Sequence, residues 1–335
     1  MYDASSRPDP DSPSLNECLE VGPSLHTKLR EILIRNRMQP IALIADLKQA
    51  FLQIRVREQD RDVLRFHWIK DRLTKAMEIL RFTRPLFGLI QSPFLLDGTT
   101  ECHLDLCKEE FPETVLEILK SMYVDDIISG GSVMSKVELF KAELIEIFKR
   151  AKFELHKWNS NVPSLESDVP MDVCTEGTSA KEVNNETETA ILGVKWNKRT
   201  DELMVTIPVK NNDTTKRGIL QYLASIYDVL GLISPVLLPG KMMFREACEL
   251  KLGWDKVVPD HLREKWRKWK GSLPKFFKVP RALPAYKIPV QRIDLHGFGD
   301  ASIDGCCSVV YVVTFQESGI SQGVVCANSR LSKQI

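Results

Sequence analysis

The chain has 335 residues, enough for about two or three domains. Hydrophobic residues make up 43% and charged residues 27% of it, an average composition for folded chains that excludes collagen-like and wholly disordered proteins. The 46 Lys and Arg nearly balance the 45 Asp and Glu, so a net charge of +1 attracts neither a polyanion nor an anionic membrane. A nucleic-acid surface would therefore need local clusters of cations.

Cysteine usage and apolar patterning point to the compartment. Eight cysteines without a C-x-x-C pair are typical of reduced thiols inside a cell. The N-terminus carries acid and proline where a secretion signal needs an apolar stretch. The most apolar stretch, 218–240, contains Asp228 and Pro235, which favours buried helices over a membrane span. We expect an intracellular, cytoplasmic protein that does not bind a membrane.

The N-terminal part of the chain alternates helix and strand patterns. Apolar residues at helical spacing predict a helix within 25–40, with basic residues such as Arg37 on its polar side. The short apolar run 41–45 predicts a buried strand, and Asp46 would lie at its end. Another strand is predicted at 63–69.

Two helices flank an acidic turn. Helices are predicted at 93–107 and at 137–151, the second with Leu139 on its apolar face. Between them, the apolar runs of 115–128 surround the pair Asp125-Asp126, which predicts a hairpin turn.

The C-terminal part begins with a change of composition. Residues 160–190 are polar and acidic, which predicts a flexible insertion or linker. Strands are predicted at 191–196 and 203–207, and helices occupy 213–273. Three β-rich runs close the chain, at 293–298, 306–314 and 323–326.

Asp46 and the pair Asp125-Asp126 are candidate metal ligands. Each acid lies at the end of an apolar strand, where a carboxylate is desolvated unless it binds a cation. Two Mg²⁺ ions in a phosphoryl-transfer site need hard oxygen ligands of this kind. The alternative is that Asp-Asp forms an ordinary hairpin turn.

Three motifs carry a resemblance to a known family. Ala45-Asp46-Leu47-Lys48-Gln49-Ala50-Phe51 resembles the first catalytic motif of retroelement reverse transcriptases, and Tyr123-Val124-Asp125-Asp126 resembles their Y-x-D-D box. Between them, Pro85-Leu86-Phe87-Gly88-Leu89-Ile90-Gln91-Ser92-Pro93-Phe94 is similar to their template and dNTP motif. The runs 86–88, 153–161 and 225–235 resemble the BEL/Pao retrotransposon branch.

The resemblance implies a role for each matching residue. Asp46, Asp125 and Asp126 would hold two Mg²⁺ ions, or Mn²⁺, with the backbone carbonyl of Leu47 as a further ligand. Phe51 would exclude a ribose 2′-hydroxyl, since ring bulk rejects one extra group, although it could be a core phenylalanine. The other residues implied to contact template, dNTP or primer are Tyr123, Gly88 and Gln91; strand packing and a turn glycine are the alternatives for the first two.

Three weaker matches keep their alternatives open. Ile191 to Trp196, with Leu192 and Gly193, is similar to the hairpin that holds the primer. Lys157 would protonate the departing pyrophosphate, or be a solvated lysine. The run 265–270 interleaves cations with aromatics, as nucleic-acid surfaces do, or as an amphipathic helix with a solvated face does.

Both ends of the chain depart from the family pattern. Leu295 to Ser302 resembles the first strand of a ribonuclease H domain, whose Asp300 would be a metal ligand, but its partner acids do not follow before Ile335. Tyr2 to Ser5 resembles the tail of a fingers strand whose dNTP-binding cations are missing. Phe87 stands where most retroviral relatives have Gln.

The resemblance implies an α+β right-hand polymerase with partial fingers, a palm, a helical thumb and connection, and an incomplete ribonuclease H-like segment. We predict fingers and palm in 1–160, the acidic linker in 161–190, the primer-holding hairpin and thumb in 191–285 and the ribonuclease H-like strands in 286–335.

The implied activity is RNA-directed DNA synthesis. The implied partners are RNA or DNA template with primer, dNTP and other segments of a Pol polyprotein, in the cytoplasm or a virus-like particle. The alternatives are a catalytically silent remnant that only binds primer-template, and, less favoured, a nuclease acting through Asp300.

Overall fold

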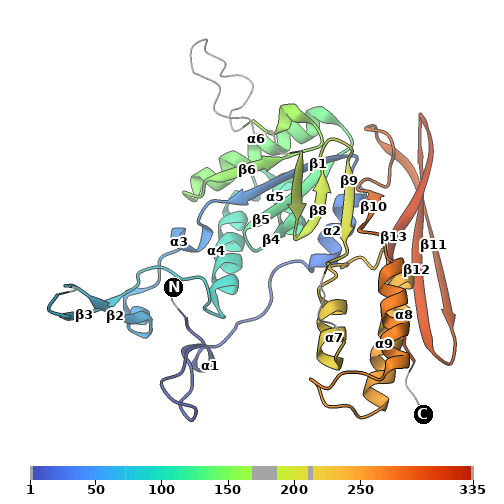
Figure 1. Cartoon of the computed structure of the whole chain (residues 1–335). Coiled ribbons are helices and arrows are strands. Elements are labelled where there is room, and N and C mark those ends of the chain that lie inside the picture. Colours follow the sequence, from blue (N-terminus) through green and yellow to red (C-terminus); the bar gives the residue numbers. More distant parts are fainter. Residues whose placement is uncertain (1–2, 72, 168–186, 210–213, 333–335) are drawn as a thin grey trace. The chain divides into compact units, whose positions relative to one another are not determined.

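The computed structural model describes residues 3–71, 73–167, 187–209 and 214–332 (Figure 1). It has a mixed α/β fold with several separate sheets. The chain forms two compact units. The first contains Met1–Lys28, Ala45–Ile128 and Glu138–Trp158, and the second contains Leu29–Ile44, Ser129–Val137 and Asn159–Ile335. The domain boundaries predicted at 160, 190 and 285 stay predictions.

A four-stranded sheet of order β4-β5-β1-β6 carries the predicted acids. Its strands are β1 (Ile41–Leu47), β4 (Met122–Tyr123), β5 (Asp126–Gly131) and β6 (Leu155–Asn159). Every residue of β1 except Asp46 is buried, as expected for an apolar strand with a neighbour on each side. The strand predicted before Asp46 is confirmed and extends one residue beyond it.

Short helices and one hairpin complete the first unit. Helices α4 and α6 confirm the two predicted at 93–107 and 137–151. However, Leu139 is 58% exposed, because the buried face of α6 follows Val137, Leu144 and Phe148 instead. The helices and strands that lie mainly in this unit, apart from the four-stranded sheet, have the following bounds: α1 (Leu15–Cys18), α3 (Ala50–Gln53), η1 (Glu58–Leu64), β2 (Arg65–Ile69), β3 (Met77–Arg81), α4 (Ser92–Cys107), α5 (Pro112–Ser121) and α6 (Met134–Arg150).

A second four-stranded sheet, in the second unit, is antiparallel and has the order β10-β9-β8-β7. The strands at 188–191 and 194–197 are joined by a two-residue turn, Leu192-Gly193. This turn interrupts the strand that the pattern predicted at 191–196 and forms a hairpin there, as the resemblance implied. Both turn residues have positive φ, 46° and 84°, as tight hairpins of type I′ require. A left-handed conformation costs Leu192 about 1–2 kcal/mol. The strands are β7 (Glu188–Ile191), β8 (Val194–Asn197), β9 (Glu202–Thr206) and β10 (Phe276–Pro280).

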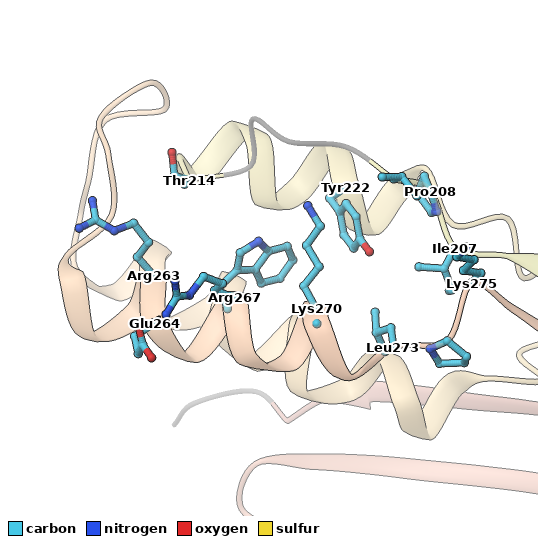
Figure 2. A pocket seen from close by; sticks show the side chains of 14 residues that line it. Ile207, Pro208, Thr214, Tyr222, Arg263, Glu264, Arg267, Lys270, Leu273 and Lys275 are labelled. Carbon is cyan, nitrogen blue, oxygen red and sulfur yellow. Dashed lines mark hydrogen bonds and ion pairs between the residues drawn. The ribbon is translucent and has the colours of Figure 1, made fainter.

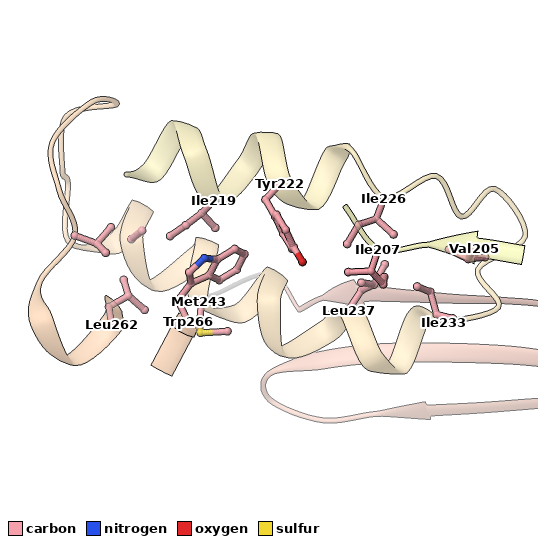
Figure 3. Packing of buried hydrophobic residues seen from close by; sticks show 12 residues of the cluster. Val205, Ile207, Ile219, Tyr222, Ile226, Ile233, Leu237, Met243, Leu262 and Trp266 are labelled. Atoms are coloured by element: carbon pink, nitrogen blue, oxygen red, sulfur yellow. The ribbon is translucent and has the colours of Figure 1, made fainter. Parts of the chain in front are cut away.

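Helices α7 (Lys216–Ala224), α8 (Ser234–Glu249) and α9 (Asp260–Ser272) account for the apolar sequence between 213 and 273. Their inner faces form one buried cluster that includes Tyr222 and Trp266 (Figure 3). The predicted helices are confirmed. In the ranges that the structure describes, no helix has the length and apolarity needed to cross a membrane.

The last three strands form an antiparallel sheet of order β11-β12-β13. They are β11 (Val290–Ala301), β12 (Gly305–Gln316) and β13 (Gly319–Leu331), each longer than its predicted β-rich run. Helix α8 packs on β13 (Figure 1).

Buried arginines join distant segments of the second unit. Helix α2 (Leu29–Arg37) confirms the predicted N-terminal helix, but Arg37 is buried, contrary to the predicted polar face. Its guanidinium donates to the backbone carbonyls of Pro280, Arg281, Val324 and Val325. Burial, and then the charge of Arg281, lowers the pKa of Arg37 to about 10.

Arg281 is fully buried and forms two bonds with Asp201, at 2.6 and 2.7 Å. It also donates to the carbonyls of Asn36, Gln39 and Pro40. This network connects α2, the loop after β8 and the end of β10.

The predicted acidic linker is only partly described. Residues 168–186 lie outside the described ranges. The residues on either side are ordered, in η2 (Pro163–Leu165) and in β7. Glu166, whose side chain is 11% exposed, forms an ion pair at 2.8 Å with the buried Lys198, since burial of one charge requires the other. These edges of the segment are therefore part of the fold rather than a linker.

Candidate active site

The first unit brings Asp46, Asp125 and Asp126 to one edge of the β4-β5-β1-β6 sheet. The Leu47 amide donates to the Asp125 carbonyl at 2.8 Å, which fixes the end of β1 beside the turn between β4 and β5. Tyr123 pairs with Asp126 across that turn, and Val124 within it has φ of 57°. A β-branched residue in this conformation is strained, and such strain concentrates at functional sites.

Burial and neighbouring acids raise the affinity of Asp125 and Asp126 for protons. Burial, then the charges of Asp125 and Asp46, raises the pKa of Asp126 to about 6. Burial is also the main cause that raises the pKa of Asp125, with Asp46 adding to it. Crowded, partly buried carboxylates of this kind favour a bound cation.

Lys157 supplies positive charge at this position. Its Nζ donates to Asp46 Oδ2 at 2.8 Å, and this bond is the main cause that raises the lysine pKa; the charges of Asp126 and Asp125 act in the same direction. His156 Nε2 lies 3.3 Å from Asp46 Oδ1. Adjacent residues of a strand normally point to opposite faces. Here Lys157 has φ of 52°, an irregularity that accounts for both side chains reaching one carboxylate.

Hard oxygen donors fit Mg²⁺, so the chemistry of the three acids agrees with the predicted metal ligands. Among the residues the structure describes, no three His, Cys, Asp or Glu side chains are gathered as a metal site. Asp46 is engaged by Lys157 instead, so metal binding would require this carboxylate to exchange its partner.

The residues predicted to contact template and dNTP lie in the same unit. Phe51, in α3, is only 6% exposed, because its ring packs edge-on against the exposed ring of Phe87 at 4.9 Å. Gly88 has φ of 93°, a conformation that favours glycine. Gln91 precedes α4, and its Oε1 is buried with no hydrogen-bond partner among the described residues.

A pair that the sequence did not predict, His26 with Asp97, lies beside Tyr123. The His26 ring lies edge-on to the Tyr123 ring at 5.2 Å, and His26 Nδ1 is 3.0 Å from Asp97 Oδ2. Burial is the main cause that raises the pKa of Asp97. No local signal could have revealed this pair, because 71 residues separate its members.

Other predicted site residues, Leu192, Gly193 and Asp300, belong to the second unit. The first two form the tip of the β7–β8 hairpin. Asp300 is exposed on β11, opposite Cys307, and its carboxylate accepts a bond from the Ala301 amide.

The basic and aromatic run of α9 separates into two faces. Trp266 is 2% exposed and Trp269 donates to the Val236 carbonyl, so both rings pack against the other helices rather than being free to stack on bases. The helix is therefore amphipathic, and a nucleic-acid role for its cations stays a prediction. Arg267 and Lys270 instead line a groove of about 620 Å³, with Arg263 one turn earlier (Figure 2).

Comparison with known proteins gives a family match and similar folds among solved structures. Residues 215–334 match the family described as "Pao retrotransposon-like RNaseH-like domain". The match takes in α7, α8 and α9 as well as the final sheet. No curated protein matches the chain.

One of the solved structures of similar fold is described as "Structure of the foamy viral protease-reverse transcriptase dRH in complex with ds DNA". The TM-score is 0.59 at 14% sequence identity, over 97% of this chain and 50% of that chain. The present chain thus spans half the length of that protein, and the likeness concerns the fold.

Proposed function

We propose that this chain is the polymerase region of a BEL/Pao-type retrotransposon Pol polyprotein and performs RNA-directed DNA synthesis. The observation that carries the proposal is the convergence of Asp46 with Asp125 and Asp126, fixed by the Leu47–Asp125 backbone bond. The Pao-type match of the C-terminal part and the similar fold of a retroviral reverse transcriptase support it. In this proposal the first unit contains fingers and palm, and α7 to α9 form the thumb.

The three aspartates would hold two divalent ions, Mg²⁺ or Mn²⁺, with the Leu47 carbonyl as a further ligand. When bound, the ions would activate the primer 3′-hydroxyl and stabilise the pyrophosphate that leaves. The raised pKa of Asp126 means that this carboxylate accepts a proton more readily than an ordinary aspartate. Protons would therefore compete with a metal ion for Asp126 at acidic pH.

Lys157 would act on the leaving group. Its Nζ is protonated at neutral pH, as a proton donor to pyrophosphate requires, and the raised pKa favours this ammonium form further. Its present bond to Asp46 places the ammonium within the acidic cluster. Once a metal neutralised Asp46, Lys157 would be released toward the substrate.

Phe51, Gly88, Gln91 and Tyr123 would line the nucleotide site. The buried, unpartnered Gln91 Oε1 supports this role, because an orphaned acceptor gains a hydrogen bond when a ligand arrives. Phe51 would select dNTP by bulk, with Phe87 holding its ring.

The nucleic acid would contact the second unit. The solved structure of similar fold is described as a complex with double-stranded DNA, which supports a duplex partner here. Arg263, Arg267 and Lys270 follow one side of α9 with spacings of four and three residues, suited to a phosphate backbone. We propose the cytoplasm or a virus-like particle as the location.

A second candidate is a catalytically silent remnant that only binds primer-template. The pairing of Asp46 with Lys157 favours it, since the acids are not assembled as a metal site.

Extension of a DNA primer on an RNA template distinguishes the two candidates. We expect the purified chain to add dNTPs with Mg²⁺ or Mn²⁺, and Asp125→Asn to lose at least about a hundredfold in rate, because it removes a metal ligand. Asp105→Asn, at an exposed position of α4, is the matched control and should extend normally. Binding of primer-template without extension by the wild type would establish the silent remnant.

A further inference from the structure

The tip of the β7–β8 hairpin is held in a costly conformation by a residue far along the chain. Leu192 has φ of 46°, which a branched side chain rarely adopts. Its carbonyl accepts a 2.8 Å hydrogen bond from the Tyr227 hydroxyl. The second turn residue, Gly193, has φ of 84°.

The ring of Tyr227 also packs against the turn. A Cβ added to Gly193 would lie 3.1 Å from Tyr227 Cε1, which is tighter than ordinary contact. Glycine at this position therefore serves both the turn and the close approach of the ring. Tyr227 thus contacts both residues of the turn.

Tyr227 itself begins a segment that is anchored at several points. The carboxylate of Asp228 accepts hydrogen bonds from the amides of Leu232 and Ile233, at 2.8 and 2.9 Å, just before α8. The Leu230 carbonyl accepts a bond from the Ala327 amide of β13 at 2.8 Å.

A glycine tightens the same anchor. A Cβ on Gly231 would meet the Ala327 carbonyl at 1.9 Å, so no other residue fits there without a shift. The segment after Tyr227 is therefore fixed to the C-terminal sheet.

We propose that Tyr227 is a positioning residue that clamps the Leu192-Gly193 turn, and that its anchor on β13 makes the turn a rigid contact for the primer strand. The inference rests on the proposed polymerase function for its role, but the clamp can be tested without any activity. In this proposal the role of β13 is structural, because it anchors the segment that carries Tyr227, and this role needs no nuclease activity.

Amide hydrogen exchange of the full chain tests the clamp directly. Tyr227→Phe should speed exchange of the amides within 188–197 about fivefold, as loss of one hydrogen bond implies, while the sheet β11-β12-β13 exchanges as before. In the double variant that carries Leu192→Asn as well as Tyr227→Phe, exchange within 188–197 should be slower again, because Asn tolerates the left-handed conformation. Tyr311→Phe, at a similarly exposed tyrosine packed against Phe298, is the matched control and should change nothing in this hairpin.

Primer-extension kinetics test whether the clamp by Tyr227 helps to hold the primer. If the wild type extends primers, Tyr227→Phe should raise the KM for primer-template several-fold with kcat unchanged. Unaltered exchange in the hairpin would overturn the clamp, and altered exchange with unaltered KM would overturn its role in holding the primer. Faster exchange in the variant together with an inactive wild type would leave the clamp standing and reject the polymerase function.

Discussion

At the scale of single residues, Asp126 and Lys157 experience the same crowded carboxylates with opposite consequences. Burial and neighbouring acids make ionisation of Asp126 unfavourable. The same acids stabilise the ammonium of Lys157. Both pKa values are therefore raised, which disfavours the charged form of Asp126 and favours that of Lys157, and perturbed pKa values of this kind cluster at functional sites.

We expect Asp126→Asn to stabilise the metal-free protein at pH 8 and to lose this advantage at pH 4. The folded pKa of Asp126, about 6, exceeds the ordinary 3.8. The contribution of this carboxyl to stability is thus fully present below its unfolded pKa and lost as pH rises through 6. Urea unfolding in EDTA at several pH values measures the difference. A stability gap that is the same at pH 4 and pH 8 would contradict the prediction.

At the scale of elements, the run 265–270 of α9 contributes side chains both to the buried cluster of the helices and to the exposed groove. Its tryptophans pack toward α7 and α8, and its cations remain in solvent or line the groove (Figures 2 and 3). Lys270 Nζ lies 4.7 Å from the centre of the Tyr222 ring, across the groove. The helix is therefore a candidate for contact with phosphates but not for stacking on bases.

Replacing Arg267 and Lys270 together with Gln should weaken duplex binding and reduce the slope of log affinity against log salt by about 2, since each lost phosphate contact removes about 0.9. Fluorescence anisotropy at several salt concentrations measures both quantities. The matched control replaces Lys265 and Lys268, which are on the same helix but do not line the groove. Equal losses in the two double variants would show that only net charge matters.

At the scale of the second unit as a whole, Arg281 connects segments distant in sequence: it pairs with Asp201, 80 residues earlier, and donates to the carbonyl of Asn36, 245 residues earlier. Asp201 also accepts bonds from Trp196 Nε1 and Asn161 Nδ2. A buried pair with several partners makes the folding of these segments interdependent.

Arg281→Met should lower the free energy of unfolding by about 3–5 kcal/mol, because it leaves the Asp201 carboxylate without its cation. Denaturant unfolding provides the measurement. Arg292→Met, which breaks an exposed pair with Asp294, should cost less than about 1 kcal/mol. A loss at Arg281 as small as that at Arg292 would show that the network does not hold the segments together.

Local pattern determined most elements of this protein. The apolar run before Asp46, the acidic turn, the helices between 213 and 273 and the three final strands are all present as predicted, because hydrophobic periodicity and turn residues are properties of neighbouring residues. The errors were also local in origin. Arg37 and Leu139 were assigned to the wrong surface because a pattern does not show which neighbour will cover a side chain. For the same reason the pattern left two alternatives open for the tryptophans of α9.

The sequence by itself thus determined which acids could form a site and in which elements they lie. Only the tertiary structure decided their partners: Lys157 and His156 on Asp46, Asp97 behind His26, Tyr227 on the Leu192 turn and Asp201 on Arg281. The sequence had already marked Asp46 and Leu192 as site residues, whereas the other two acceptors, Asp97 and Asp201, carried no local signal. The physical reason is that hydrogen bonds and burial act between residues distant in the chain, and their geometry exists only once the chain has folded.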